Sequence, residues 1–129
     1  MANEPLLVVD DSVLSLKIAR ALLTSAGYEV QTASDAETAL HMLETFRPRV
    51  ILTDIFLPGM DGLELTRRLK SDPLRRDIKI LALTGSSMDV DGARAIKAGC
   101  DGYIQKPVDP ETLATIVASY IAAAADIER

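Results

Sequence analysis

Short runs of apolar residues recur along the chain, and each is bounded by turn residues or by charged residues. The runs at 6–9 and 50–53 show no alternation of polar and apolar positions, which predicts strands buried on both faces, as in a parallel sheet. Residues 28–32 do alternate, which predicts a strand near a sheet edge. Two further runs predict strands at 78–84 and 103–105. The pattern therefore indicates five strands.

The segments between these strands carry apolar residues at helical spacing. Ser12 can cap the first helix, and Gly27 ends it. The expected inward face of this helix is Ser15, Ile18, Ala19, Leu22 and Ala26. Ser34 and Glu37 have the spacing of a capping box, so a second helix is expected to open there.

Three more helices complete the pattern. Helices are expected over 62–71 and 90–98, although Gly92 inside the second costs about 1 kcal/mol against Ala. Asp109 caps the last helix and Pro110 starts it. Five strands and five helices alternate with short links, which demands parallel strands, right-handed crossovers and helices on both faces. We predict an α/β, flavodoxin-like doubly wound parallel sheet with strand order 2-1-3-4-5, formed by residues 1–129 as a single domain.

The composition narrows the functional classes. The chain has 129 residues, and a net charge of −5 without a basic run argues against nucleic acid and anionic membrane surfaces as partners. Its one cysteine, Cys100, excludes an internal disulfide and fits a reducing cytoplasm. No apolar run is long enough to span a membrane, and Glu4 and Pro5 stand where a signal peptide would need basic and then apolar residues. We therefore expect a cytoplasmic protein.

Polar residues gather where the strands are predicted to end. Asp10 and Asp11 follow the first strand and Asp54 follows the apolar run of the third. In a sheet of the predicted order these strands are neighbours, and the crevice between them is where ligands bind. Thr84 and Lys106 end the fourth and fifth strands, so they are expected at the same edge.

Three neighbouring acids repel one another, since one charge pair at about 4 Å costs on the order of 4 kcal/mol at an effective dielectric constant of 20. Either one acid is protonated or a cation lies among them, and carboxylate oxygens with room for water suit Mg²⁺. A cation, the ammonium of Lys106 and the hydroxyl of Thr84 around one carboxylate would cradle a phosphoryl group. This arrangement indicates nucleophilic attack by Asp54 on phosphorus, which gives an aspartyl phosphate.

Four short segments stand in a fixed order along the chain. They are VVDD at 8–11, Asp54 followed by LPGMDG at 57–62, TG at 84–85, and AGCDGYIQKP at 98–107. Each alone is a weak signal, but together they are highly specific. Over essentially its whole length the chain resembles the receiver domain of two-component response regulators. The resemblance implies that Asp54 accepts a phosphoryl group from a histidine kinase or a histidine phosphotransfer protein.

The resemblance also implies a metal site and limits the chemistry. Asp11, Asp54 and the backbone carbonyl of Phe56 would ligate Mg²⁺, and Asp10 would contribute through water. Apart from its own phosphotransfer and autodephosphorylation, a domain of this family is not an enzyme.

Thr84 and Tyr103 match the family's switch pair. The resemblance implies that the hydroxyl of Thr84 moves toward the phosphoryl group and that Tyr103 turns inward. The face formed by the fourth helix, the fifth strand and the fifth helix would then change. Through this face the domain would control a downstream protein target or form a homodimer, with no direct contact to nucleic acid or membrane.

Three other functions use a similar fold or similar chemistry. A haloacid-dehalogenase-like phosphohydrolase needs a second acid two residues after its nucleophile, where this chain has Phe56. A flavodoxin-type flavin carrier needs a hydroxyl- and glycine-rich loop after the first strand, where Asp10 and Asp11 would repel phosphate. The alternative is a receiver-like module that binds partners without phosphorylation. Such a module would not need the three acids together with Thr84 and Lys106, which argues against it. The chain ends soon after the fifth helix, so a stand-alone regulator and a receiver cut from a longer protein both stay open.

Overall fold

A computed structural model describes residues 4–85, 88–106 and 108–128, so Pro107 of the last motif and Arg129 lie outside the described residues. The strands are β1 (Pro5–Val9), β2 (Glu29–Ala33), β3 (Val50–Asp54), β4 (Lys79–Thr84) and β5 (Gly102–Gln105). The helices are α1 (Val13–Ser25), α2 (Ala36–Met42), α3 (Gly62–Lys70), α4 (Met88–Ala98) and α5 (Pro110–Glu128). All strand pairs are parallel, and the sheet order is β2-β1-β3-β4-β5. The predicted doubly wound fold is confirmed, with β2 at one edge.

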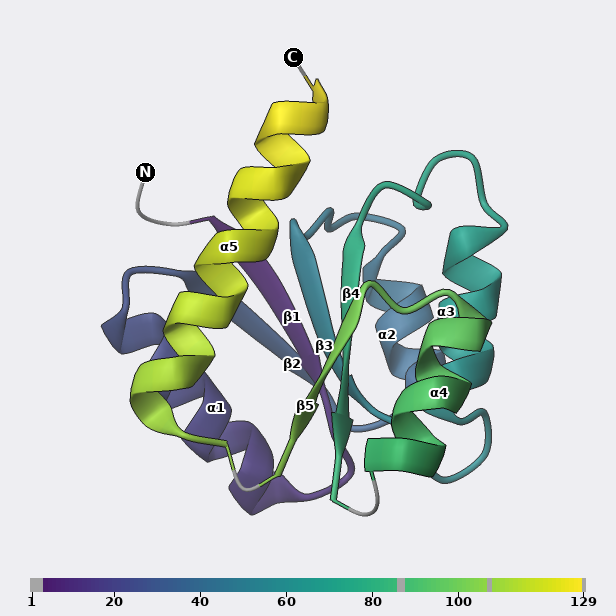
Figure 1. Ribbon diagram of the computed structural model, residues 1–129, viewed down its shortest axis with the longest axis horizontal. Coiled ribbons are helices and arrows are strands. Elements are labelled where there is room, and N and C mark those ends of the chain that lie inside the picture. The colour runs from purple at the N-terminus through teal and green to yellow at the C-terminus, as the bar shows by residue number, and fades with distance from the viewer. Residues whose placement is uncertain (1–3, 86–87, 107, 129) are drawn as a thin grey trace.

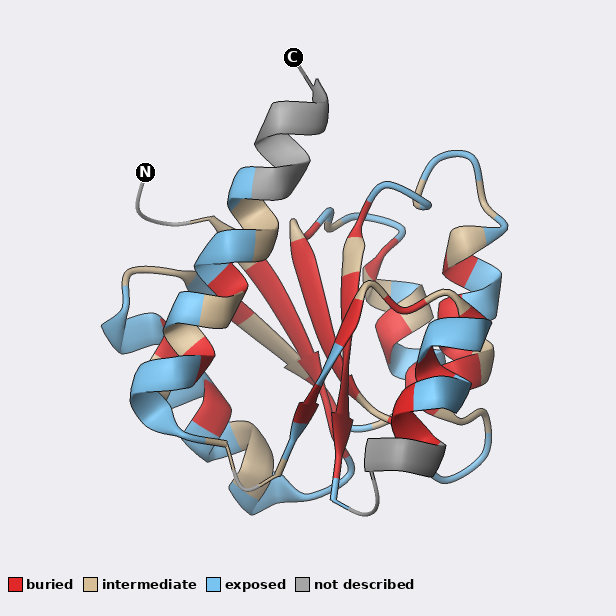
Figure 2. Ribbon diagram, viewed as in Figure 1, coloured by how far each residue is buried: buried red, intermediate tan, exposed pale blue. Residues whose placement is uncertain are grey.

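Helices cover both faces of the sheet, as Figure 1 shows: α1 and α5 lie on one face, and α2, α3 and α4 lie on the other. Each face has its own apolar cluster. Leu7 and Ile51 point into the cluster beneath α2, α3 and α4, while Leu6 and Leu52 point into the cluster beneath α1 and α5. Alternate residues of one strand therefore bury on opposite faces, which is why these runs are continuously apolar (Figure 2). Within the described residues, no helix has the length and apolarity to cross a membrane.

The carboxyl ends of the strands meet at one edge of the sheet, marked by the arrowheads in Figure 1. Val9 of β1 pairs with Thr53 of β3, so the next residues along the two strands are Asp10 and Asp54. Asp54 itself pairs with Leu83 of β4. The fold thus brings β1, β3 and β4 together at the point where the strand order reverses.

The inward face of α1 differs from the prediction. Leu23 and Ala19 are the buried residues of this helix, whereas Ile18 is 46% exposed and Ala26 is exposed. Leu16, Leu22 and Tyr28 pack at the margin of the same cluster. The apolar stripe that packs on the sheet therefore runs through 16, 19 and 23, at helical spacing, and turns Ile18 toward solvent.

The cap of α2 also differs from the prediction. Asp35, not Ser34, is the N-cap residue, and its Oδ1 accepts a hydrogen bond from the backbone nitrogen of Thr38 at 2.6 Å. Glu37 does not close a capping box. Instead its Oε2 accepts from the backbone nitrogen of Met60 at 3.1 Å, which ties α2 to the loop between β3 and α3. A carboxylate nearer the helix start takes the capping role, because Asp is as good an N-cap as Ser.

Candidate functional site

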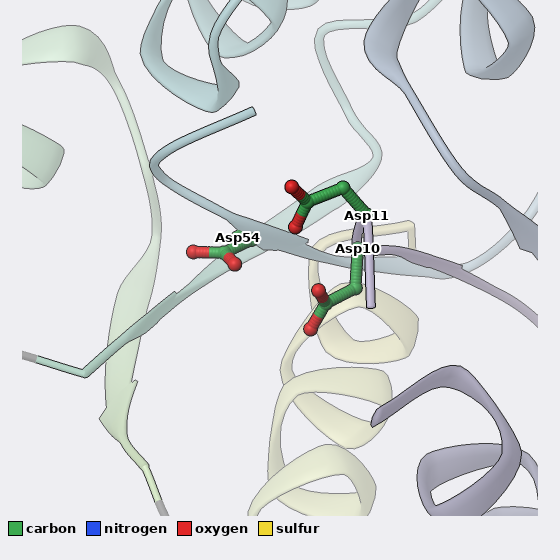
Figure 3. A group of neighbouring side chains, drawn as sticks. All are labelled: Asp10, Asp11 and Asp54. Carbon is green, nitrogen blue, oxygen red and sulfur yellow. The ribbon is translucent and has the colours of Figure 1, made fainter. Parts of the chain in front are cut away.

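Three carboxylates lie together at the carboxyl edge of the sheet. Asp10 and Asp11 follow β1, and Asp54 ends β3; Figure 3 shows the three side chains side by side. Each offers an oxygen, and these oxygens all lie within 4.8 Å of one another. Asp10 is buried, Asp54 is half-buried and Asp11 is exposed, so the cluster opens to solvent on one side.

Backbone contacts fix the first of these acids. The nitrogen of Asp10 donates to the carbonyl oxygen of Ala33 at 3.1 Å, which extends the pairing of β1 with β2 by one residue. The Oδ1 of Asp10 accepts from the backbone nitrogen of Ser12 at 2.9 Å. Ser12 in turn caps α1, since its side chain accepts from the nitrogen of Ser15. The start of α1 therefore holds one oxygen of Asp10 and leaves Oδ2 for the site.

Lys106 reaches the acids from the end of β5. Its Nζ lies 2.9 Å from Oδ2 of Asp10 and 3.2 Å from Oδ2 of Asp54. Its backbone nitrogen donates to the carbonyl oxygen of Thr84 at 2.7 Å, which continues the pairing of β4 with β5. One ammonium thus bridges two of the three carboxylates. Charge at the site stays negative, because three acids face one base.

Burial and charge shift two pKa values at the site. Desolvation raises the pKa of Asp54, and the negative charge of Asp10 adds to this effect, against the lowering influence of Lys106. For Lys106, desolvation alone would lower the pKa. The hydrogen bond to Asp10 and the charge of Asp54 outweigh it, so the pKa of Lys106 is raised. The surroundings of Asp54 therefore disfavour its charged form, and a cation bound beside it would stabilise that form.

The donor set suits a hard divalent cation. Carboxylate oxygens from different segments, with one side open to water, match the ligands that Mg²⁺ takes in proteins. Phe56, whose carbonyl is the third predicted ligand, lies beside the cluster: its backbone nitrogen donates to Oδ1 of Asp54 at 3.4 Å. Phe56 is 55% exposed, so it lies outside the apolar core. The residues present thus fit a magnesium ion.

Thr84, the hydroxyl predicted to face the site, has a partner in α4. This residue is fully buried at the end of β4, and its Oγ1 donates to Oδ2 of Asp91 at 3.2 Å. Asp91 is itself buried, with 5% of its surface exposed. No spacing rule in the sequence marks this acid, because a helical stripe of apolar residues gives no reason to bury an aspartate.

Tyr103 lies on β5 with 40% of its surface exposed. A Cβ added at Gly92 of α4 would lie 3.0 Å from Cζ of Tyr103, so the ring rests against the backbone of α4 at this glycine. This contact explains the glycine that weakens the predicted helix: the ring takes the space of a side chain. Tyr103 and Thr84 therefore both contact α4, at consecutive residues.

The loop that follows Asp54 depends on Gly62, which ends the LPGMDG segment and begins α3. A Cβ added at Gly62 would lie 2.1 Å from the backbone oxygen of Asp54, a distance that no side chain tolerates. The nitrogen of Gly62 donates to the carbonyl of Ile55 at 2.9 Å, and Asp61 caps α3 through the nitrogen of Glu64 at 2.8 Å. The Asp-Gly pair was a visible signal, since it opens a helix directly after the Asp54 loop.

Two other residues, His41 and Cys100, behave as ordinary structural positions. His41 is exposed, and its Nδ1 lies 3.9 Å from Oε2 of Glu44. Cys100 is a free, buried cysteine whose Sγ lies 3.5 Å from the hydroxyl of Thr66. Burial raises the pKa of this thiol, which disfavours the reactive thiolate.

Comparison with known proteins places these features in a family. Residues 6–118 match the family described as response regulator receiver domain. The response regulator PleD of Caulobacter vibrioides is 38% identical over 104 residues, which cover 81% of this chain and 23% of PleD. The chain thus spans about a quarter of that relative.

Two further matches cover most of this chain and most of the matched protein. The polar-differentiation response regulator DivK of Brucella anthropi is 36% identical over 115 residues, which are 89% of this chain and 94% of DivK. The receiver domain of sensor histidine kinase PA1611 from Pseudomonas aeruginosa superposes with a TM-score of 0.86 at 30% identity, over 94% of this chain and 99% of that one. Its crystal structure has a magnesium ion coordinated in the active site cleft. The sheet order, the acidic cluster and the match over residues 6–118 agree, and this chain belongs to the response regulator receiver domain family of two-component systems.

Proposed function

We propose that this protein accepts a phosphoryl group on Asp54 from a histidine kinase or a histidine phosphotransfer protein. The observation that carries the proposal is the position of Lys106, whose ammonium lies 3.2 Å from Asp54 and 2.9 Å from Asp10 within a cluster of three acids. The ammonium of Lys106 beside Asp54 can stabilise the negative charge of the phosphoryl oxygens during transfer. Asp54 is also open to a donor, because it is not fully buried.

In the proposed reaction, a carboxylate oxygen of Asp54 forms a bond to phosphorus. The bond between phosphorus and the imidazole nitrogen of the donor breaks, and its electron pair stays on that nitrogen, which takes a proton from water. The product is an acyl phosphate on Asp54 and a neutral histidine. Hydrolysis of the acyl phosphate by water returns the carboxylate and releases inorganic phosphate.

Asp10, Asp11 and Asp54, with the backbone carbonyl of Phe56, are the residues that would hold Mg²⁺. A magnesium ion bound there would neutralise charge on the transferred phosphoryl group. Lys106 orients Asp54 through the contact to its Oδ2 and supplies the second positive charge. Buried Asp10 keeps Lys106 in place, because its Oδ1 is already held by the start of α1.

The consequence of phosphorylation is proposed to lie on the α4–β5–α5 face, where Tyr103 and Ile96 are exposed. A change there controls binding to a downstream protein target or to a second copy of the chain. We place the protein in the cytoplasm, where its single cysteine stays reduced, and we treat residues 1–129 as one receiver domain.

The experiment is an intact-mass measurement after incubation with acetyl phosphate, with Mg²⁺ or with a chelator. The wild type with Mg²⁺ is expected to gain the mass of one phosphoryl group. Asp54→Asn, and the wild type with the chelator, are expected to gain none. The matched control is Asp61→Asn, which alters an acid of the same loop and keeps the acceptor. A wild type that gains no mass while folded would favour the phosphorylation-independent binding module instead.

A further inference from the structure

Asp91 is a buried carboxylate of α4 outside the acidic cluster. Oδ2 of Asp91 accepts a hydrogen bond from the hydroxyl of Thr84 at 3.2 Å, and Oδ1 lies 3.8 Å from Nη1 of Arg94, one turn along the helix. Only 7% of the Asp91 side chain is exposed, against 51% for Arg94. Burial of a charge without partners is costly, and the hydrogen bond from Thr84 offsets part of that cost for Asp91.

The hydroxyl of Thr84 has a single proton to donate. In the structure, that proton is directed to Asp91 on α4. Thr84 is also the residue next to Leu83, which pairs with Asp54 in the sheet, so a phosphoryl group on Asp54 is a second acceptor near the same hydroxyl. The two acceptors lie on different elements, α4 and the end of β3. Donation to the phosphoryl group therefore requires loss of the bond to Asp91.

Gly92, the residue after Asp91 in α4, contacts Tyr103. Gly92 has no side chain, and a Cβ added there would lie only 3.0 Å from Cζ of Tyr103, so the ring packs closely against the backbone at this residue. The dipeptide Asp91-Gly92 thus contacts the end of β4 with its first residue and β5 with its second. A displacement of this turn of α4 alters the surroundings of Thr84 and of Tyr103 together.

We propose that Asp91 is a positioning residue that competes with the phosphoryl group on Asp54 for the hydroxyl of Thr84, and that its release frees the adjoining Gly92 contact of Tyr103. The proposal rests on the proposed function, because it needs a phosphoryl group on Asp54. It adds a residue of α4 that stabilises the unphosphorylated form. Removal of the Asp91 acceptor should then favour the phosphorylated form.

The test is a double-mutant cycle on the affinity for beryllium fluoride with Mg²⁺, a mimic of the phosphoryl group on a carboxylate. The four proteins are the wild type, Asp91→Ala, Thr84→Val and the double variant. Asp91→Ala is expected to bind the mimic about tenfold more tightly than the wild type, the factor that corresponds to one hydrogen bond. In the Thr84→Val background the same substitution is expected to change the affinity by less than about twofold.

Asp91→Asn keeps an acceptor and the side-chain volume, so it serves where the alanine variant does not fold. Its affinity is expected between those of the wild type and Asp91→Ala, and its effect should likewise vanish with Thr84→Val. Equal effects of Asp91 substitution with and without the Thr84 hydroxyl would overturn the proposal. A wild type that does not bind the mimic at all, while folded and supplied with Mg²⁺, would instead overturn the proposed function.

Discussion

The ammonium of Lys106 lies 3.2 Å from a carboxylate oxygen of Asp54, although 52 positions separate the two residues. Sheet topology produces this contact, because β5 and β3 flank β4 and all three strands end at one edge. The same ammonium contacts Asp10 at 2.9 Å. Lys106 therefore contacts the proposed acceptor directly and opposes the rise that burial causes in the pKa of Asp54.

Lys106→Met should slow phosphorylation of Asp54 by acetyl phosphate about 10²-fold, the order seen when one preorganised charge or donor is removed from a reacting centre. Loss of the ammonium also raises the pKa of Asp54 further, since Lys106 is its main lowering influence. The rate of mass gain at saturating Mg²⁺ measures the effect. Lys97→Met, an exposed lysine of α4, is the control and should react at the wild-type rate. Equal rates for all three proteins would contradict the assigned role of Lys106.

Asp54→Asn should stabilise the metal-free protein, and the gain should grow with pH. Desolvation raises the pKa of Asp54 in the folded state above its ordinary value of 3.8, so between these two values the folded state keeps a proton that the unfolded state loses. Stability contributed by this group therefore falls as pH rises through that window. Urea unfolding of both proteins with a chelator, from pH 3 to pH 8 in steps of about one unit, checks the sign. A gain that shrinks as pH rises would be incompatible with a raised pKa.

Gly62→Ala should destabilise the protein by about 2 kcal/mol or more, because overpacking against fixed backbone costs this much. The added Cβ would meet the backbone oxygen of Asp54 at 2.1 Å. Phosphorylation should fall as well, since the acceptor itself must move. Gly85→Ala is the matched control: among the described residues, nothing lies within 4 Å of its added Cβ. Thermal unfolding that gives equal losses for both variants would refute this role of Gly62.

Gly92→Ala tests the contact between α4 and Tyr103. Alanine is favoured in a helix over glycine by about 1 kcal/mol, so the substitution should stabilise a Tyr103→Ala protein by about that amount. In the wild-type background the added Cβ meets the ring at 3.0 Å, and the gain should be smaller by at least about 0.5 kcal/mol. Urea unfolding of the four proteins gives the difference. The same gain in stability in both backgrounds would contradict a close contact between the Tyr103 ring and residue 92.

Much of the fold follows from hydrophobic patterning. Continuous apolar runs such as 50–53 can be buried only between two layers of helices, and alternation with helices leaves few topologies. The predictions that were wrong concern which face of α1 is buried and which residue caps α2. Several overlapping stripes on α1 are apolar, so the pattern alone predicts Ile18 to face inward. Only packing against β2 and α5 selects the stripe that includes Leu23. The cap at Asp35 shows a similar limit, since two neighbouring residues can each cap a helix.

The part of the site that lies at the ends of the strands was predictable from the sequence. Asp10, Asp11 and Asp54 follow apolar runs, and their meeting is a consequence of sheet order. Asp91 was not predictable, because its burial depends on how α4 packs on the end of β4. The need for glycine at 62 depends likewise on a backbone approach that spacing does not reveal.

The most direct measurement locates the phosphoryl group. Borohydride reduces the acyl carbon of an aspartyl phosphate with two hydrides: the first displaces phosphate and gives the aldehyde, and the second gives the alcohol of homoserine. After treatment with acetyl phosphate, Mg²⁺ and borohydride, the tryptic peptide 50–67 should contain homoserine at position 54 and unchanged aspartate at position 61. Homoserine at another acid, or none anywhere in a folded and Mg²⁺-loaded protein, would contradict Asp54 as the acceptor.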